Sequence, residues 1–154
     1  MVPGGKGLSV MRIAIGSDHR GVAVVDRLIE RLEAQGHEVL PVGRCAAESC
    51  DYPESAWCVA NVVADGQADR GILICGSGIG VSMAANKVPG VRAALVHDAA
   101  AAEMTRRHND ANVLCLSAER TDPDAAEAIV AAFLAAPFEG GRHARRVAML
   151  AEIE

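Results

Sequence analysis

A cysteine directly before a glycine-rich segment is the feature of this sequence best suited to chemistry. Cys75 ends an apolar run and is followed by Gly76-Ser77-Gly78-Ile79-Gly80. Three glycines within five residues let a backbone turn sharply and approach a ligand closely. If a helix begins after this turn, its N–H groups favour a nearby anion and the thiolate form of Cys75. A thiolate there is a candidate general base, although a cysteine that only packs is an equally good interpretation of the residue alone.

Two nucleotide-binding motifs fit this glycine segment poorly. A dinucleotide fingerprint needs a glycine where Val81 stands, and an acidic residue about 20 positions later at the end of a strand. A Walker A loop needs a Lys followed by Ser or Thr after the glycines, and no such pair follows. An NAD-dependent oxidoreductase is therefore disfavoured, and a purely structural turn stays as an alternative.

Polar residues that could complete a site stand at the ends of other apolar runs. Asp18 and His19 follow one run, and His108 precedes another. Arg142 and Arg146 are four residues apart, so on a helix both guanidinium groups lie on one face and can hold a phosphate dianion. An ordinary charged surface would explain the two arginines equally well.

The apolar pattern predicts the elements that must position these residues. Short apolar runs predict strands at 12–16, 37–42, 71–75, 91–96 and 113–116. Helical spacing, glycine stops and helix-forming composition predict helices at 22–35, 52–65, 81–87, 99–107, 123–135 and 142–153. This alternation implies an α/β fold of three layers (α/β/α), with a Rossmann-like five-stranded parallel sheet and helices on both faces. Ligands of such sheets bind beyond the carboxyl ends of the strands.

Length and charge narrow the class of protein. The 154 residues predict a flexible N-terminal extension at 1–10 and a single domain at 11–154. The net charge of −5 argues against a nucleic-acid partner, and no apolar stretch approaches the roughly 20 residues of a membrane span. The five cysteines contain no C-x-x-C pair and match no common zinc pattern. Reduced thiols and a cytoplasmic location are therefore expected.

Six segments, taken together and in this order, resemble the ribose-5-phosphate isomerase B and galactose-6-phosphate isomerase family. They are 16–21 (GSDHRG), 51–53 (DYP), 71–80 (GILICGSGIG), 84–87 (AANK), 108–114 (HNDANVL) and 138–143 (FEGGRH). The resemblance extends from Met11 to about Ile153. It implies a metal-free enzyme without a cofactor that interconverts an aldose phosphate and a ketose phosphate. Its partners would be a small sugar phosphate and further copies of itself, in a homodimer or tetramer whose sites are shared between subunits.

The same resemblance implies a role for each matching residue. Cys75 would be the base that removes the proton beside the carbonyl to give a cis-enediol, and Ser77 would assist it. His108 would help to open the cyclic sugar, and Asp18 would take part in ring opening or proton transfer. The other positions would bind substrate: the enediolate at the backbone of Gly76, Gly78 and Gly80, the phosphate at His19, Arg142 and Arg146, and the rest of the sugar phosphate at Tyr52, Asn86 and Asn109.

One departure from the family pattern concerns the substrate more than the reaction. Where the family commonly has Arg, this chain has Glu119, and Arg120 follows it. A carboxylate beside a phosphate repels it, so either Arg120 takes over after a backbone shift or the pocket is altered. Isomerisation of ribose 5-phosphate to ribulose 5-phosphate is the expected activity. Allose 6-phosphate, galactose 6-phosphate, a tetrulose phosphate, or a non-catalytic sugar-phosphate-binding module are the alternatives.

Overall fold

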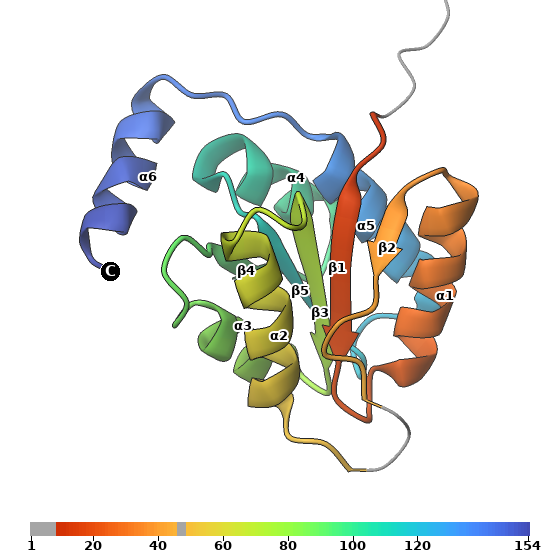
Figure 1. The fold of residues 1–154 in the computed structure, drawn as a ribbon. Coiled ribbons are helices and arrows are strands. Elements are labelled where there is room, and N and C mark those ends of the chain that lie inside the picture. Colours follow the sequence, from red (N-terminus) through yellow and green to blue (C-terminus); the bar gives the residue numbers. More distant parts are fainter. Residues whose placement is uncertain (1–8, 46–48) are drawn as a thin grey trace, which may run out of the picture.

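The computed structural model describes residues 9–45 and 49–154, and shows a parallel sheet between two layers of helices (Figure 1). Residues 1–8 of the predicted N-terminal extension lie outside the described residues. The predicted three-layer α/β fold is confirmed.

The sheet places the ends of two central strands side by side. Its strands are β1 (Arg12–Ser17), β2 (Glu38–Leu40), β3 (Arg70–Cys75), β4 (Ala93–Leu95) and β5 (Val113–Ser117). They lie in the order β2-β1-β3-β5-β4, and every pair is parallel. The chain adds β2 on one side of β1 and β3 on the other, so a crevice opens between the carboxyl ends of β1 and β3.

The helices cover both faces because the strand residues alternate. One face carries α1 (Val22–Ala34), α4 (Ala99–Asn109) and α5 (Pro123–Ala135), and the other carries α2 (Tyr52–Ala64) and α3 (Ile79–Ala85). On β3, Ile72 and Ile74 pack toward the first face, whereas Leu73 and Cys75 pack toward the second. No helix of the described residues is long and apolar enough to cross a membrane.

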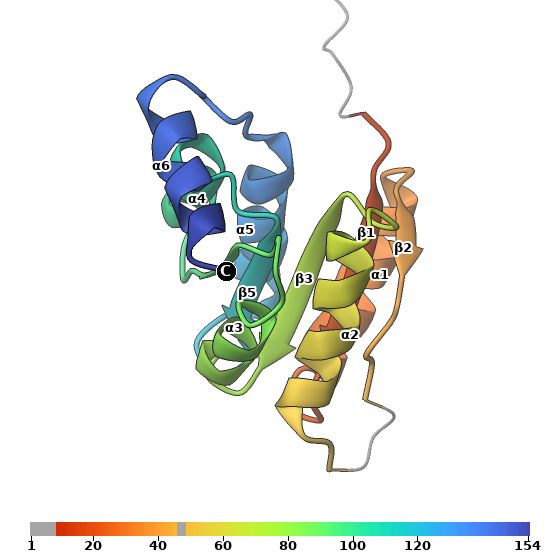
Figure 2. The same cartoon turned by 60° about the vertical axis from the view of Figure 1, so that its left-hand side comes forward.

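The last helix, α6 (Arg142–Glu152), stands apart from the sheet and lies beside α4 (Figure 2). Its buried residue is His143, while Met149 and Leu150 on the helix and Ile153 just after it are exposed. The helix therefore presents an apolar side that the rest of the described chain does not cover.

The loop between β2 and α2 corrects one expectation. Cys45 and Cys50, expected as reduced thiols, form a disulfide with a Cα–Cα distance of 6.1 Å. The N–H of Cys45 donates to the carbonyl of Ser17 at 3.2 Å, which anchors one end of this loop against β1. The two cysteines are thereby brought within the distance that a disulfide spans, although no motif marks them. Cys58, Cys75 and Cys115 are free thiols, and the cytoplasmic location stays a prediction.

Gly78 allows a test of how tightly the glycine segment packs. It has φ +78°, and an added Cβ would lie 2.5 Å from Leu95 Cδ1 and 2.9 Å from the backbone of Leu116. We expect Gly78→Ala to lower the free energy of unfolding by about 2–4 kcal/mol, measured by urea denaturation. Gly36→Ala is the matched control, because Gly36 also has positive φ (+88°) but meets nothing within 4 Å. Its loss should be about 1 kcal/mol, and equal losses in the two variants would contradict the packing argument.

Candidate active site

A cavity of about 240 Å³ opens at the carboxyl ends of β1 and β3. The residues around it come from the end of β3, from the loops after β1, β3 and β5, and from the starts of α2 and α3. They are Asp18, Arg20, Tyr52, Cys75, Gly76, Ser77, Gly80 and Glu119. The switch point of the sheet therefore gathers many of the residues predicted for the site.

Cys75 is turned toward the glycine segment and not away from it. Its side chain is nearly buried yet borders the cavity, and its Sγ accepts a hydrogen bond from the N–H of Gly78 at 3.1 Å. The left-handed conformation of Gly78 is what lets the chain fold back onto the sulfur. Behind it lies Cys115, whose pKa is raised by complete burial and by the neighbouring Cys75. Cys115 is therefore held as a thiol.

The tip of β5 holds the glycine segment in place. Ala118 N–H donates to the carbonyl of Cys75 at 2.9 Å, and Glu119 N–H donates to that of Gly76 at 3.1 Å. The Ser117 hydroxyl donates to the same Gly76 carbonyl at 2.7 Å. Three hydrogen bonds thus fix the backbone on which the cysteine stands.

The loop after β1 and the start of α2 supply the facing side chains. Asp18 is 7% exposed, and its carboxylate accepts from the N–H of Arg20 at 2.9 Å. The Tyr52 ring lies against Gly80, where an added Cβ would come within 2.6 Å of a ring carbon. Ser77 is exposed at the cavity, and its hydroxyl accepts from Ile79 N–H at 3.2 Å. All these side chains face one cavity with Cys75.

His19 lies next in sequence to Asp18 but does not border the cavity. Its Nδ1 accepts a hydrogen bond from the N–H of Cys50 at 3.4 Å, so it is held against the disulfide loop. His19 therefore lies at the same end of the sheet as Cys75, beside the cavity.

A second cluster of predicted residues lies at the opposite end of the sheet (Figure 1). His108 and Asn109, at the end of α4, line a cavity of about 360 Å³ with Arg146 and His143. Arg142 begins α6 beside them. Because α4 begins at the carboxyl ends of the strands and runs back along the sheet, it carries His108, nine residues after Ala99, about 14 Å away from those ends. One chain thus does not bring His108, Arg142 and Arg146 to Cys75.

Two histidines and a carboxylate form the centre of this second cluster. The rings of His108 and His143 stack with centroids 4.2 Å apart, and Glu139 Oε2 lies 3.7 Å and 3.5 Å from their Nε2 atoms. The Nε–H of Arg107 donates to Glu139 Oε1 at 2.6 Å, and this hydrogen bond is the main cause of the lowered pKa of Glu139. Burial, and then the nearby His108 and Arg142, lower the pKa of His143.

The charges around this cluster favour an anion over a metal cation. His108, Glu139 and His143 offer three ligand atoms within 4.8 Å of one another, a set that could hold a metal ion. The positive charges of Arg142 and Arg146 both lower the pKa of His143, and they would also repel a metal cation bound beside it. A phosphate fits these charges better than a divalent metal does.

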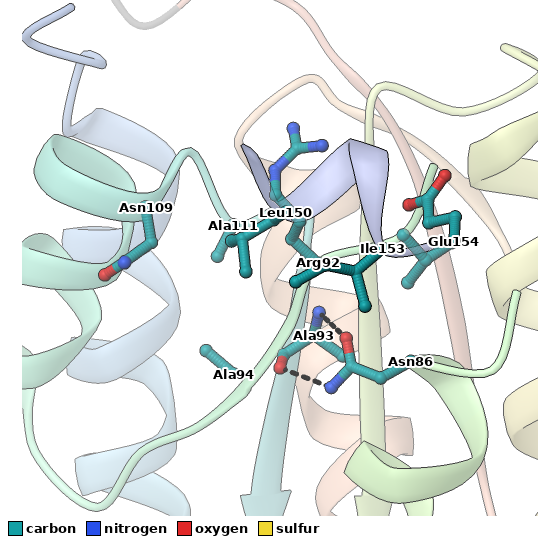
Figure 3. Close-up of a pocket in the computed structure, with 10 residues that line it drawn as sticks. Asn86, Arg92, Ala93, Ala94, Asn109, Ala111, Leu150, Ile153 and Glu154 are labelled. Carbon is teal, nitrogen blue, oxygen red and sulfur yellow. Dashed lines mark hydrogen bonds between the residues drawn. The ribbon is translucent and has the colours of Figure 1, made fainter. Parts of the chain in front are cut away.

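Asn86 lines neither the cavity beside Cys75 nor the cavity beside His108. Figure 3 shows its amide paired with the backbone of Ala93, donating to the carbonyl at 2.9 Å and accepting from the N–H at 2.8 Å. This amide joins the end of α3 to β4, in a cavity of about 500 Å³ that Asn109 and Leu150 also line. The substrate-binding role of Asn86 stays a prediction.

Arg20 is the site residue that sequence reasoning missed. Its guanidinium NH1 pairs with Glu119 Oε1, and both side chains lie over Gly76. Arg120, the other candidate to replace the usual arginine, is exposed and does not border the cavity. The signal available in the sequence was Glu119 itself, a carboxylate at a position where the family commonly has arginine.

Comparisons with known proteins agree with this geometry. The pattern of the Ribose/Galactose Isomerase family matches residues 13–150. The chain belongs to this family. It is 43% identical over 143 residues to ribose-5-phosphate isomerase B of Escherichia coli (strain K12), covering 93% of this chain and 96% of that one.

Two further relatives bear on the substrate. The D-erythrulose-4-phosphate isomerase of Pectobacterium atrosepticum is 38% identical over 143 residues, covering 90% of this chain and 91% of that one. The crystal structure of ribose-5-phosphate isomerase B from Mycoplasma genitalium with bound ribulose-5-phosphate has a TM-score of 0.89 and 43% identity, covering 92% of this chain and 95% of that chain. This family member is therefore an isomerase, and its relatives are sugar-phosphate isomerases.

The second cluster can be tested by titration of His143. Its pKa is lowered from 6.5, so the imidazole should be neutral at a pH just below that value. Inorganic phosphate bound beside it would stabilise the imidazolium and move the midpoint upward. The measurement is the NMR titration of the His143 Hε1 signal with and without phosphate. His37, which directly precedes β2, is the control whose signal phosphate should leave unchanged. If the titration midpoint of His143 is the same with and without phosphate, an anion site at this cluster is contradicted.

Proposed function

We propose that this isomerase interconverts ribose 5-phosphate and ribulose 5-phosphate, with the Cys75 thiolate as the general base. The observation that carries the proposal is the hydrogen bond from Gly78 N–H to Cys75 Sγ, at the edge of a cavity. A backbone N–H bonds more strongly to a negative sulfur than to a neutral thiol, so this contact favours the thiolate. The relative that holds ribulose-5-phosphate supports the choice of substrate.

The reaction needs one proton to leave one carbon and one to reach its neighbour. After the sugar ring opens, the thiolate of Cys75 takes the proton from C2 of the aldose. The electrons of the C–H bond form the C1–C2 double bond, and the carbonyl oxygen becomes the enediolate oxygen. The thiol of Cys75 then returns the proton to C1, which regenerates the thiolate, while the proton of the C2 hydroxyl is transferred to the oxygen on C1, which leaves a C2 carbonyl and gives the ketose. Asp18, 7% exposed at the same cavity, is suited to move the hydroxyl protons.

We further propose that the working form is a homodimer or a larger assembly with shared sites. The base lies at one end of the sheet, whereas His108 and the arginines of α6 lie at the other, so a second copy would have to supply them. The exposed apolar residues of the α6 region, Met149, Leu150 and Ile153, are suited to contact such a copy. Each chain would then give its base to one site and its ring-opening histidine to another.

A tetrulose phosphate is the second candidate substrate. The D-erythrulose-4-phosphate isomerase matched by this chain supports it, as does Glu119 at the edge of the cavity. A shorter sugar would place its phosphate differently relative to this carboxylate.

The activity is tested with a panel of aldose phosphates of four to six carbons. We expect turnover of ribose 5-phosphate to give the highest kcat/KM of the panel.

Cys75→Ala should lower kcat by about a thousandfold or more, because the base is removed, while KM changes little. Cys58→Ser is the matched control, since Cys58 is a partly exposed thiol that does not border the cavity. Normal turnover in Cys75→Ala would contradict the mechanism.

Shared sites are tested by mixing two inactive chains. Cys75→Ala and His108→Ala chains, expressed together, should form mixed dimers in which one site carries both substitutions and the other carries neither. Random pairing would restore about one quarter of the wild-type activity per chain. The measurement compares co-expressed chains with the two variants purified separately. No recovery, in a preparation that mass spectrometry shows to contain mixed dimers, would contradict site sharing.

A further inference from the structure

The pair formed by Arg20 and Glu119 lies where a substrate would pass. Both residues border the cavity with Cys75, and both lie over Gly76, where an added Cβ would be 2.9 Å from Arg20 Cδ and 3.1 Å from Glu119 Oε1. The two side chains are each 58% exposed. An ion pair this exposed contributes little to stability, so its place at the rim calls for another explanation.

The backbone fixes where the two charges stand. Glu119 N–H donates to the Gly76 carbonyl at 3.1 Å, and Arg20 N–H donates to the Asp18 carboxylate at 2.9 Å. Both side chains therefore start from positions tied to the two loops that carry Asp18 and Cys75. They can reach the cavity rim without a change in the fold.

Without Arg20, the charged side chains around this cavity would repel an anion. Among the residues that line it in the described chain, Asp18 and Glu119 are acidic, and Arg20 supplies the positive charge. In that part of the chain, Arg20 uses NH1 to bond Glu119, which leaves Nε and NH2 without a hydrogen-bond partner. A guanidinium can hold a carboxylate with one edge and a phosphate oxygen with another.

We propose that Arg20 binds the phosphate group of the substrate from the same chain as Cys75, and that Glu119 opposes it as a specificity-determining carboxylate. Glu119 lowers the affinity for any substrate whose phosphate comes close to it, so it restricts where along the cavity the phosphate can lie. The inference rests on the proposed action on a sugar phosphate and assigns two residues to its recognition.

Opposite effects of two substitutions separate this role from a merely structural ion pair. Breaking a structural pair from either side would shift phosphate binding in the same direction or not at all. On the proposal, Arg20→Ala removes a charged donor and weakens binding of inorganic phosphate by about tenfold. Glu119→Gln keeps the shape, removes the repulsion and tightens binding by about threefold.

The test is isothermal titration calorimetry of inorganic phosphate with the full-length chain and these variants. Arg27→Ala and Glu127→Gln are the matched controls, because Arg27 and Glu127 form an exposed pair (Nε–Oε1 2.7 Å) that does not border the cavity. Their affinities should equal that of the wild type.

Unchanged affinity in Arg20→Ala, or a change of the same sign in Arg20→Ala and Glu119→Gln, would overturn the proposal. Thermal unfolding of each variant shows whether it is folded, and the KM for ribose 5-phosphate should follow the same order as the phosphate affinities. If the wild type converts no sugar phosphate, the proposed activity fails, whereas the calorimetry still decides whether Arg20 binds phosphate.

Discussion

The proposed chemistry depends on one hydrogen bond, from Gly78 N–H to Cys75 Sγ. Several parts of the fold are needed to form it. It requires a buried strand to carry the sulfur to the edge of the sheet, and a residue without a side chain to turn the backbone back over it. The space around Gly78 is already filled by Leu95 and Leu116, so another residue type would not fit there. The tip of β5 then holds the segment by hydrogen bonds to Cys75 and Gly76. On the proposed mechanism, Cys75 is therefore already in place and needs no rearrangement when substrate arrives.

Charge is divided between the two ends of the molecule. The cavity beside Cys75 is bordered by two carboxylates and one arginine, whereas Arg107, Arg142 and Arg146 gather around His108 and His143 at the other end. An anionic sugar phosphate would bind weakly to the first group alone and would lack a base at the second. This division, together with the uncovered apolar side of α6, makes an assembly of two copies the simplest way to complete a site.

The parts of the site that sequence reasoning found are those set by strand topology. Parallel strands end at one edge, so the residues after β1 and β3 were expected together, and Asp18 and Cys75 do border one cavity. The predicted strands and helices were found with small shifts at their ends, as at α3, which begins and ends two residues earlier than predicted, and at the edge strands β2 and β4, which are three residues each. Edge strands are short because one side of each lacks a partner.

The parts that were missed depend on side chains that meet across long sequence separations. Arg20 and Glu119 are 99 positions apart and meet only because the loops after β1 and β5 both reach Gly76. The disulfide of Cys45 and Cys50 depends on how one loop folds, which no spacing rule captures. The position of His108 could be predicted, because a helix that follows a parallel strand runs back from the carboxyl ends of the strands to their amino ends.

The most direct test of the central claim follows a single proton at the substrate carbon. Ribose 5-phosphate is incubated with the protein in deuterated water, and the C2 position is followed by NMR. We expect the wild type to place deuterium at C2, whereas Cys75→Ala should bind the sugar phosphate and leave the C2 proton in place. Deuterium entering C2 at the wild-type rate in Cys75→Ala would show that another group removes the proton, and would contradict the account.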